Sequence, residues 1–326
     1  MLVQIADQLR QSLGVLQKQD IQIAARYLGL DQFDAVSSSR IRLGDDCAVL
    51  PEGDGYLLLA AEGMLPTLVD AEPWFAGWCA VMVNISDIYA MGGRPIAIVD
   101  ALWSRSHSVS EGLWAGMQAA ARAYEVPIVG GHTNCRSPYN ALAATILGRA
   151  THLITSFDAR PGDILLAAID LQGQREQRYP FWNAATQADP IQLRQKLAVL
   201  PQLAAAGLCD AGKDISMGGV VGTALMLLET SGVGAVLDLD AIPRPPDVPL
   251  PEWLSCFPSY GFLLSVRPAV ANAVAERFRR LDISCTSVGT IDDTRQLVLR
   301  MQNASVVFWD LGENALTGFA PWRPHH

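Results

Sequence analysis

The chain has 326 residues, of which half are apolar and 17% are charged, and its formal net charge is −9. A chain of this length can form two domains of about 100 to 200 residues, each with its own core. The acidic balance argues against a nucleic-acid-binding surface, which needs clustered Lys and Arg. If such a protein binds a nucleotide, metal ions or a few local basic residues must accommodate the phosphates.

The cysteines and the first residues bear on the compartment. The six cysteines are scattered without a C-x-x-C pair, which predicts buried free thiols in a reducing environment. Met1 to Asp7 show no basic stretch followed by an apolar run, so no signal peptide is expected. No uncharged run approaches the roughly 18 residues of a membrane span. The sequence predicts a cytoplasmic protein that does not enter a membrane.

The N-terminal region predicts two short amphipathic helices over residues 2–30, with Lys18 between them and Gly29 as the stop of the second. Gly44 then makes a turn that leads Asp45 and Asp46 into a strand. Two acids after a glycine are commonly only a turn, so these residues alone leave their role open. A second short strand, 56–61, ends at Glu62, which is either a site acid or an exposed acid at a strand end.

The apolar residues from Trp74 to Tyr89 recur at helical spacing and predict a largely buried helix. Asn84 and Asp87 lie one turn apart on another side of it. A carboxylate on such a helix needs a partner, which is either a functional ligand or an ordinary hydrogen-bond donor. Gly92 and Gly93 are expected to end the helix before the next strand.

Strand 96–103 and helix 109–124 precede a second combination of strand and glycine turn, in which Gly130 and Gly131 are followed by His132 and Thr133. Glycines there would let backbone N–H groups approach a phosphate, although His132 could equally be a satisfied turn residue. Residues 140–150 predict another strand, and we place a domain boundary near residue 152.

In the second half, residues 164–169 predict a strand, 171–189 a lid or surface loop, and 190–208 a helix. Asp214 and Ser216 then precede a helix that runs to Glu229. Both are good helix N-caps, so the alternative to a functional Asp214 is a capping box.

The motif N-x-S-D-x-Y-A-M-G-G-x-P, from Asn84 to Pro95, resembles an ATP-binding superfamily. That superfamily contains aminoimidazole ribonucleotide (AIR) synthetase, thiamine-monophosphate kinase, the hydrogenase-maturation carbamoyl dehydratase and selenophosphate synthetase. The tyrosine and the double glycine are most similar to selenophosphate synthetase. Gly44 to Val49 resembles the G-D-D-A-A-V phrase of the superfamily, and Asp214 to Gly218 resembles its D-x-S/T phrase. Gly130 to Thr133 resembles the G-G-H-S/T phrase of selenophosphate synthetases, where thiamine-monophosphate kinases have G-G-D-T. The resemblance covers about residues 40–300.

The resemblance implies an α+β, PurM-like fold of two domains. Residues 1–152 would form an N-terminal ATP- and Mg²⁺-binding domain, whose mixed sheet builds a β-barrel across a dimer. Residues 153–326 would form a C-terminal α/β domain with a sheet flanked by helices. The implied partners are a second copy of the chain and a small-molecule phosphoryl acceptor.

The same resemblance implies the site. ATP and Mg²⁺ are the expected cofactors, and carboxylates suit Mg²⁺. The predicted catalytic and metal-binding residues are Asp46, Asp87 and Asp214. The predicted nucleotide-binding residues are Asp45, Glu62, Asn84, Gly130, Gly131, His132 and Thr133.

These features predict an ATP- and Mg²⁺-dependent phosphotransferase or ATP-activating synthetase acting on an unidentified small molecule. Glu62 departs from the acid motif of the superfamily, and Lys18 lacks the neighbouring cysteine of selenophosphate synthetases, so selenide is not the expected acceptor. One alternative is a maturation-type carboxamide dehydratase, although the stretch 320–326 lacks the cysteine tail of those enzymes. The other is a non-catalytic nucleotide-binding or partner-binding subunit with the same fold.

Overall fold

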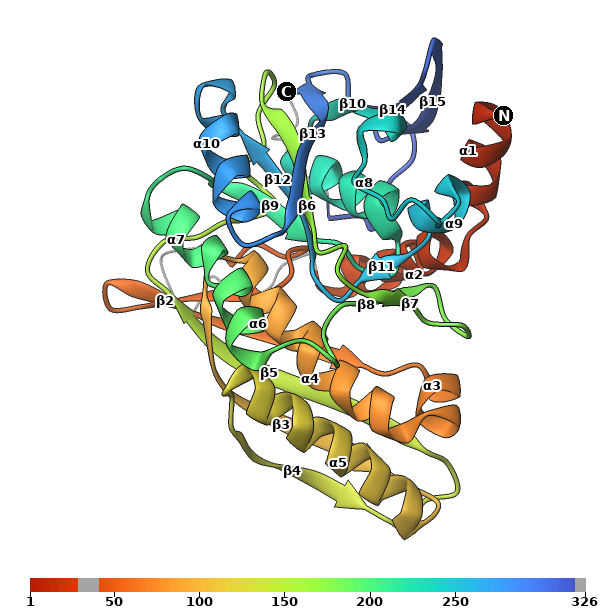
Figure 1. Cartoon of the computed structure of the whole chain (residues 1–326), viewed down its shortest axis with the longest axis vertical. Coiled ribbons are helices and arrows are strands. Elements are labelled where there is room, and N and C mark those ends of the chain that lie inside the picture. The colour runs from red at the N-terminus through yellow and green to blue at the C-terminus, as the bar shows by residue number, and fades with distance from the viewer. Residues whose placement is uncertain (29–40, 320–326) are drawn as a thin grey trace. The chain divides into compact units, whose positions relative to one another are not determined.

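The computed structural model describes residues 1–28 and 41–319 (Figure 1). The chain packs as two compact units. Unit 1 contains the described residues of Met1–Asp45, Ile154–Ala184 and Leu203–His326, and unit 2 contains Asp46–Leu153 and Ala185–Gln202. Within the described residues, none of the helices combines the length and the apolar character needed to cross a lipid bilayer.

Unit 2 is built on one mixed sheet with the strand order β1-β2-β5-β3-β4, in which only β3 and β4 run parallel. Its elements are β1 (Ala48–Glu52), β2 (Gly55–Gly63), α3 (Pro66–Ala71), α4 (Pro73–Ala90), β3 (Arg94–Trp103), α5 (His107–Tyr124), β4 (Ile128–Asn134), β5 (Ala141–Ala150) and α6 (Pro190–Leu197). The division between the units falls within α7 (Val199–Ala205).

Two helices, α4 and α5, cover one face of this sheet (Figure 1). They approach closely because glycines lie where they meet. A Cβ added to Gly77 would lie 2.1 Å from the carbonyl oxygen of Leu113, and one added to Gly116 would lie 1.8 Å from that of Trp74. Any larger residue at either position would force the helices apart.

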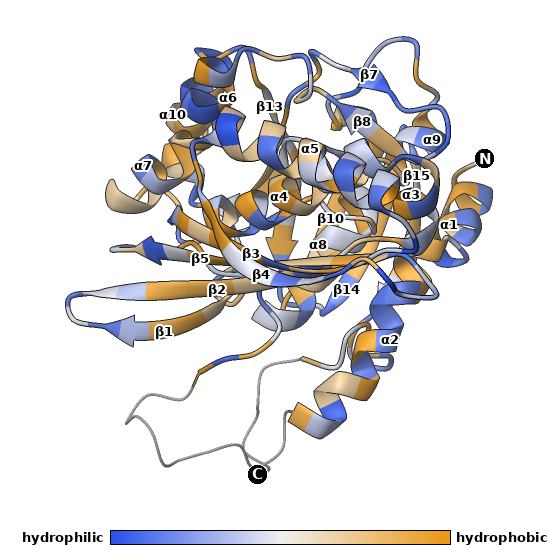
Figure 2. Ribbon diagram, turned by 90° about the horizontal axis from the view of Figure 1, so that it is seen from below, coloured by the Kyte–Doolittle hydropathy of each residue, from blue (hydrophilic) through white to orange (hydrophobic). Residues whose placement is uncertain are grey.

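The other face of the sheet is open and apolar. Leu59, Ile96, Val99 and Val129 are exposed although they are large and hydrophobic, and Figure 2 shows that much of β2 is coloured hydrophobic. On β2 and β3, Leu59 and Val99 alternate with buried residues such as Leu58 and Ile98. A sheet face in contact with water is normally polar, so this face has the character of an interface.

Unit 1 contains a seven-stranded sheet with the order β15-β14-β10-β13-β6-β12-β9 and a three-stranded sheet with the order β11-β8-β7. Its strands are β6 (Ile164–Ile169), β7 (Gln174–Arg175), β8 (Phe181–Asn183), β9 (Ala211–Asp214), β10 (Gly234–Asp238), β11 (Phe257–Pro258), β12 (Gly261–Val266), β13 (Ser284–Asp292), β14 (Gln296–Met301) and β15 (Ala304–Asp310). Its helices are α1 (Leu2–Arg10), α2 (Leu13–Leu28), α8 (Gly219–Ser231), the 3₁₀ helix η1 (Leu239–Ala241), α9 (Leu250–Leu254) and α10 (Pro268–Arg279).

Strands β6 and β12 of the larger sheet are buried along almost their whole length, as expected for strands that are covered on both faces. Helix α10 packs against β6 and β13, and α8 packs against β9, β12 and β14. Each unit therefore combines a sheet with covering helices, which confirms the predicted α+β class.

Four local predictions were wrong. Lys18 lies within α2 and not between two helices, and residues 190–208 form two helices, α6 and α7. Gly130 to Thr133 lie inside strand β4, paired with β3, and make no turn. Part of 171–189, predicted as a loop, forms β7 and β8, and Phe181 is buried there. The predicted stop at Gly29 falls outside the described residues.

We expect unit 2 to form a homodimer through its open sheet face. Replacing Val99 and Val129 by Lys should shift the protein to monomers, because two charges would have to be buried in an apolar interface. Light scattering should give twice the 35.2 kDa of one chain for the wild type. Val307→Lys is a suitable control, because Val307 is 45% exposed on β15 of unit 1. A wild-type protein that scatters as one chain at micromolar concentration would contradict the prediction.

Candidate metal and nucleotide site

Helix α4 positions Asp87 in its last turn. The backbone N–H of Gly93 donates to Ile88, Gly92 adopts a φ of +73°, and the helix ends there as the sequence predicted. Asp87 is only 6% exposed and lies at the end of the helix where the carbonyl dipoles accumulate negative charge. A carboxylate at that end of a buried helix favours a nearby cation.

Asp46 supplies a second carboxylate in the same unit. It lies two residues before β1, and its candidate ligand oxygen is within 4.8 Å of that of Asp87. The two residues are 41 positions apart in the sequence, so the fold brings them together. Two carboxylates this close repel each other unless a proton or a cation lies between them.

Asn84 lies one turn before Asp87 on α4 and is completely buried. Its Nδ2 donates to the carbonyl oxygen of Ala80 at 2.8 Å, while its Oδ1 accepts no hydrogen bond. A buried amide oxygen without a donor is costly, and it is also a suitable ligand for a hard cation or its bound water. The acids and the amide together therefore fit Mg²⁺.

Asp214 is the last residue of β9 in unit 1 and pairs in register with Phe262 of β12. The capping alternative for it is wrong. Helix α8 begins after Gly218, and no side chain accepts a hydrogen bond at that N-cap. Asp214 is buried at a strand end and serves no helix terminus.

Asp45 has a different environment from its neighbour in the sequence. Its side chain is completely buried in unit 1, where it accepts the backbone N–H of Ser156 at 2.8 Å. Its second oxygen lies 4.0 Å from the Nζ of Lys213, which is also buried. Sequence analysis did not single out Lys213, because a lysine between two motif residues gives no signal of burial.

The predicted phosphate-binding glycines lie on β4, where Gly131 opposes Asp100 of β3. A Cβ at Gly131 would lie 2.2 Å from Oδ1 of Asp100, so glycine leaves room for that carboxylate. Both oxygens of Asp100 are buried. Burial raises the pKa of Asp100, while its own backbone N–H and the charge of His132 act in the opposite direction. Asp100 was also missed, because it lies within an apolar strand.

The remaining predicted residues lie in more exposed places. His132 and Thr133 are exposed on β4, and the ring of Trp103 lies 5.5 Å from that of His132. Glu62 is exposed near the end of β2, opposite Ala144 of β5.

Arg42 lies close in sequence to Asp45 and Asp46 but contacts other residues. The guanidinium of Arg42 lies over the ring of Phe157, 4.1 Å from its centre, and 3.6 Å from the carboxylate of Asp158.

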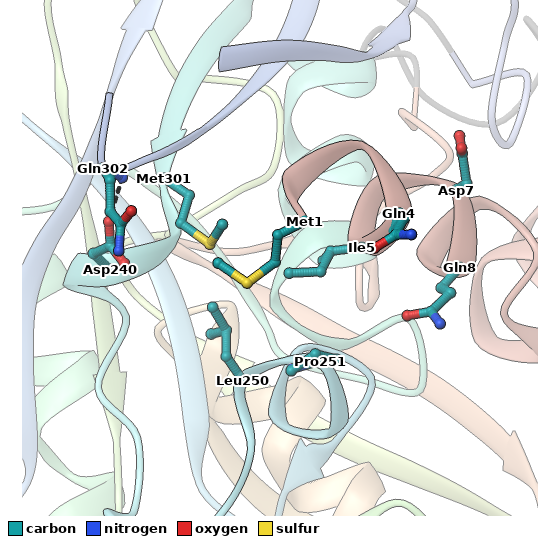
Figure 3. Close-up of a pocket in the computed structure, with 10 residues that line it drawn as sticks. All are labelled: Met1, Gln4, Ile5, Asp7, Gln8, Asp240, Leu250, Pro251, Met301 and Gln302. Atoms are coloured by element: carbon teal, nitrogen blue, oxygen red, sulfur yellow. Dashed lines mark hydrogen bonds between the residues drawn. The ribbon is translucent and has the colours of Figure 1, made fainter. Parts of the chain in front are cut away.

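The pocket in Figure 3 contains none of the predicted site residues. It has a volume of ≈ 690 Å³ in unit 1, where the side chains of Met1 and Met301 lie near each other above Leu250. Its edge is closed by a hydrogen bond from the backbone of Gln302 to Asp240. This largely apolar lining lacks the clustered oxygen ligands that a metal-bound nucleotide needs.

The buried thiols of unit 1 are poor nucleophiles. Burial raises the pKa of Cys209, Cys256 and Cys285 to about 12, so these thiols are protonated at neutral pH.

Comparison with solved structures places the fold in the PurM-like class. The PurL of T. maritima, solved with ATP, aligns with a TM-score of 0.70 at 20% identity, over 96% of this chain and 57% of that chain. AaThiL, solved with AMPPCP and TMP, aligns with a TM-score of 0.65 at 20% identity, over 87% of this chain and 94% of that chain. This chain thus spans little more than half of the PurL chain that it matches.

The family models make the assignment specific. The model of the AIR synthase related protein, N-terminal domain, matches residues 44–150, and that of the C-terminal domain matches residues 160–302. The chain belongs to the AIR synthase-related family.

Curated relatives agree with this membership. An uncharacterized protein of Synechocystis sp. is 54% identical over 98% of this chain and 99% of its own length. A thiamine-monophosphate kinase of Synechococcus elongatus is 30% identical over 62% of this chain and 68% of its own. A selenide, water dikinase of Colwellia psychrerythraea is 27% identical over 61% and 60%.

Asp100 gives a test by pH. Because its pKa is raised in the folded state, the unfolded chain loses this proton at lower pH, and Asp100 lowers stability once the pH exceeds its ordinary value near 4. Asp100→Asn should raise Tm at pH 7 by about 2 °C or more, and the gain should shrink as the pH falls toward 4. Thermal melts across this range provide the measurement, with the exposed Asp54→Asn as a control. A loss of stability at pH 7 would contradict the assignment.

Proposed function

We propose that this protein binds ATP with Mg²⁺ and uses it to phosphorylate, or to activate, a small molecule. The observation that supports this function best is the approach of Asp46 and Asp87 to within 4.8 Å in unit 2. Mg²⁺ is held by one or two protein carboxylates and keeps sites for water and for the oxygens of a nucleotide. It would also relieve the repulsion between the two acids.

The remaining site residues complete the proposal. Asn84 would orient a metal-bound water with its buried Oδ1. Asp214, at the end of β9, is proposed as a further metal-binding carboxylate. Glu62 and the β4 residues Gly130 to Thr133 would contact the nucleotide. We propose that Asp45 supports the nucleotide site from beside it, because its two carboxylate oxygens already face Ser156 and Lys213.

The proteins with a similar fold support a nucleotide-dependent reaction. PurL of T. maritima has been solved with ATP and with ADP, and AaThiL with AMPPCP and TMP. Phosphoryl transfer needs in-line positioning and neutralisation of charge, which a carboxylate-held metal ion supplies. It requires no nucleophilic thiol.

Removal of single acids should separate binding from stability. In Asp46→Asn, Asp87→Asn and Asp214→Asn we expect Mg-AMPPCP to bind at least about tenfold more weakly, because each loses an oxygen ligand. Without metal, the Tm of these variants should stay the same or rise, because repulsion is relieved. Titration calorimetry and thermal melts measure both quantities, with Asp54→Asn as the control.

Purely structural acids would behave differently. The variants would lose about 0.5–2 kcal/mol of stability and bind Mg-AMPPCP as the wild type does, which would contradict the proposal. Nucleotide binding without ADP release in the presence of any candidate acceptor would favour the non-catalytic alternative.

Selenide should not serve as the acceptor, in spite of the similarity to selenide, water dikinase. Lys18 lies within helix α2, and no cysteine stands beside it to provide a thiolate. Phosphorus NMR of the protein with ATP and selenide should show no selenophosphate above a control without protein. Its appearance would make selenide the acceptor.

A further inference from the structure

A buried carboxylate in α8 holds a segment near the C-terminal end of the described residues. Glu229 is 3% exposed and accepts the backbone N–H groups of Leu316 at 2.8 Å, Thr317 at 2.8 Å and Gly318 at 3.2 Å. The hydroxyl of Thr317 donates to it as well. These four donors satisfy the hydrogen-bonding capacity of the carboxylate oxygens. We call residues 315–319 the strap.

Helix α2 holds the opposite side of the strap. The Nε2 of Gln22 donates to the carbonyl oxygens of Ala315 at 2.9 Å and Leu316 at 3.0 Å. Gly318 has a φ of +84°, and a Cβ there would lie 3.3 Å from that of Ala25. The strap is therefore fixed by hydrogen bonds to two helices of unit 1.

Phe319, the last residue of the strap, packs on the loop that contains Gly44, Asp45 and Asp46. A Cβ added to Gly44, whose φ is +105°, would lie 2.5 Å from the Cβ of Phe319. Gly44 directly precedes Asp45, whose carboxylate is held by Ser156 on the other side. The loop is thus confined between the strap and the segment that contains Ser156.

We propose that Glu229 is a positioning residue for the metal and nucleotide site. Through its hydrogen bonds to the strap, Glu229 holds Phe319 in contact with Gly44. This contact fixes the loop that contains Asp45 and Asp46. The inference rests on the proposed function, because it assigns a support to the same site. Glu229 and Phe319 touch neither metal nor nucleotide in this scheme.

Two variants and one control test the role. Glu229→Gln places amide hydrogens against the N–H donors of the strap. Phe319→Ala removes the ring, whose Cγ would lie 2.9 Å from a Cβ at Gly44. Both variants should raise the rate of hydrogen exchange in the peptide that covers residues 41–47. Both should also weaken Mg-AMPPCP binding about tenfold, which is the lower end of the loss in metal affinity seen when a residue that supports a metal ligand is replaced. Ile291→Ala, in the core of β13, should lower Tm without either change.

The measurements keep the two proposals distinguishable. If wild-type protein does not bind Mg-AMPPCP, the proposed function fails, and hydrogen exchange alone decides whether the strap holds the loop. If Phe319→Ala leaves both the exchange of residues 41–47 and the affinity at wild-type values, the positioning role is refuted. Because this variant retains every hydrogen bond of Glu229, it remains informative if Glu229→Gln does not fold.

Discussion

The central constraint in this protein is the approach of two carboxylates, Asp46 and Asp87, to within 4.8 Å. Such an arrangement costs free energy in the absence of a cation, and the position of Asp87 in the last turn of a buried helix adds to the cost. Neighbouring features fix this arrangement: α4 is buried along most of its length, and Gly92 and Gly93 end it one turn later. The fold thus brings two acidic side chains from distant parts of the sequence together, which is common at functional sites.

The elements that sequence analysis predicted correctly depend on local signals. The end of α4 follows from two glycines, and the strands of unit 2 follow from short apolar runs. The errors arise where the determining contact is not local. Gly131 suggested a turn, but it is a glycine because Asp100 of the neighbouring strand occupies the space of a side chain. Strands as short as β7 and β8 have no measurable period, although Phe181 is buried in one of them.

The residues of the candidate site likewise differ in how far the sequence could predict them. No periodicity relates Asp46 to Asp87, so only a resemblance between motifs could predict that they act together. Asp214 could have been a helix cap by its sequence, and only the start of α8 at Gly218 excludes that role. The environments of Asp45 and Lys213 could not be predicted, because burial is a property of the whole fold and the contacts with Ser156 and between these two residues join distant parts of the sequence.

The strap indicates how the shared and the specific parts of the chain are connected. The family models match residues 44–302, with a gap at the boundary between them, so the strap lies outside the part that defines the family. It nevertheless contacts Gly44, the first residue of the matched region, through Phe319. The thiamine-monophosphate kinase and selenide, water dikinase relatives match only 61–62% of this chain. The proposed metal and nucleotide site therefore lies within the part of the chain that the family models match, whereas the strap that we propose to support it lies beyond that part.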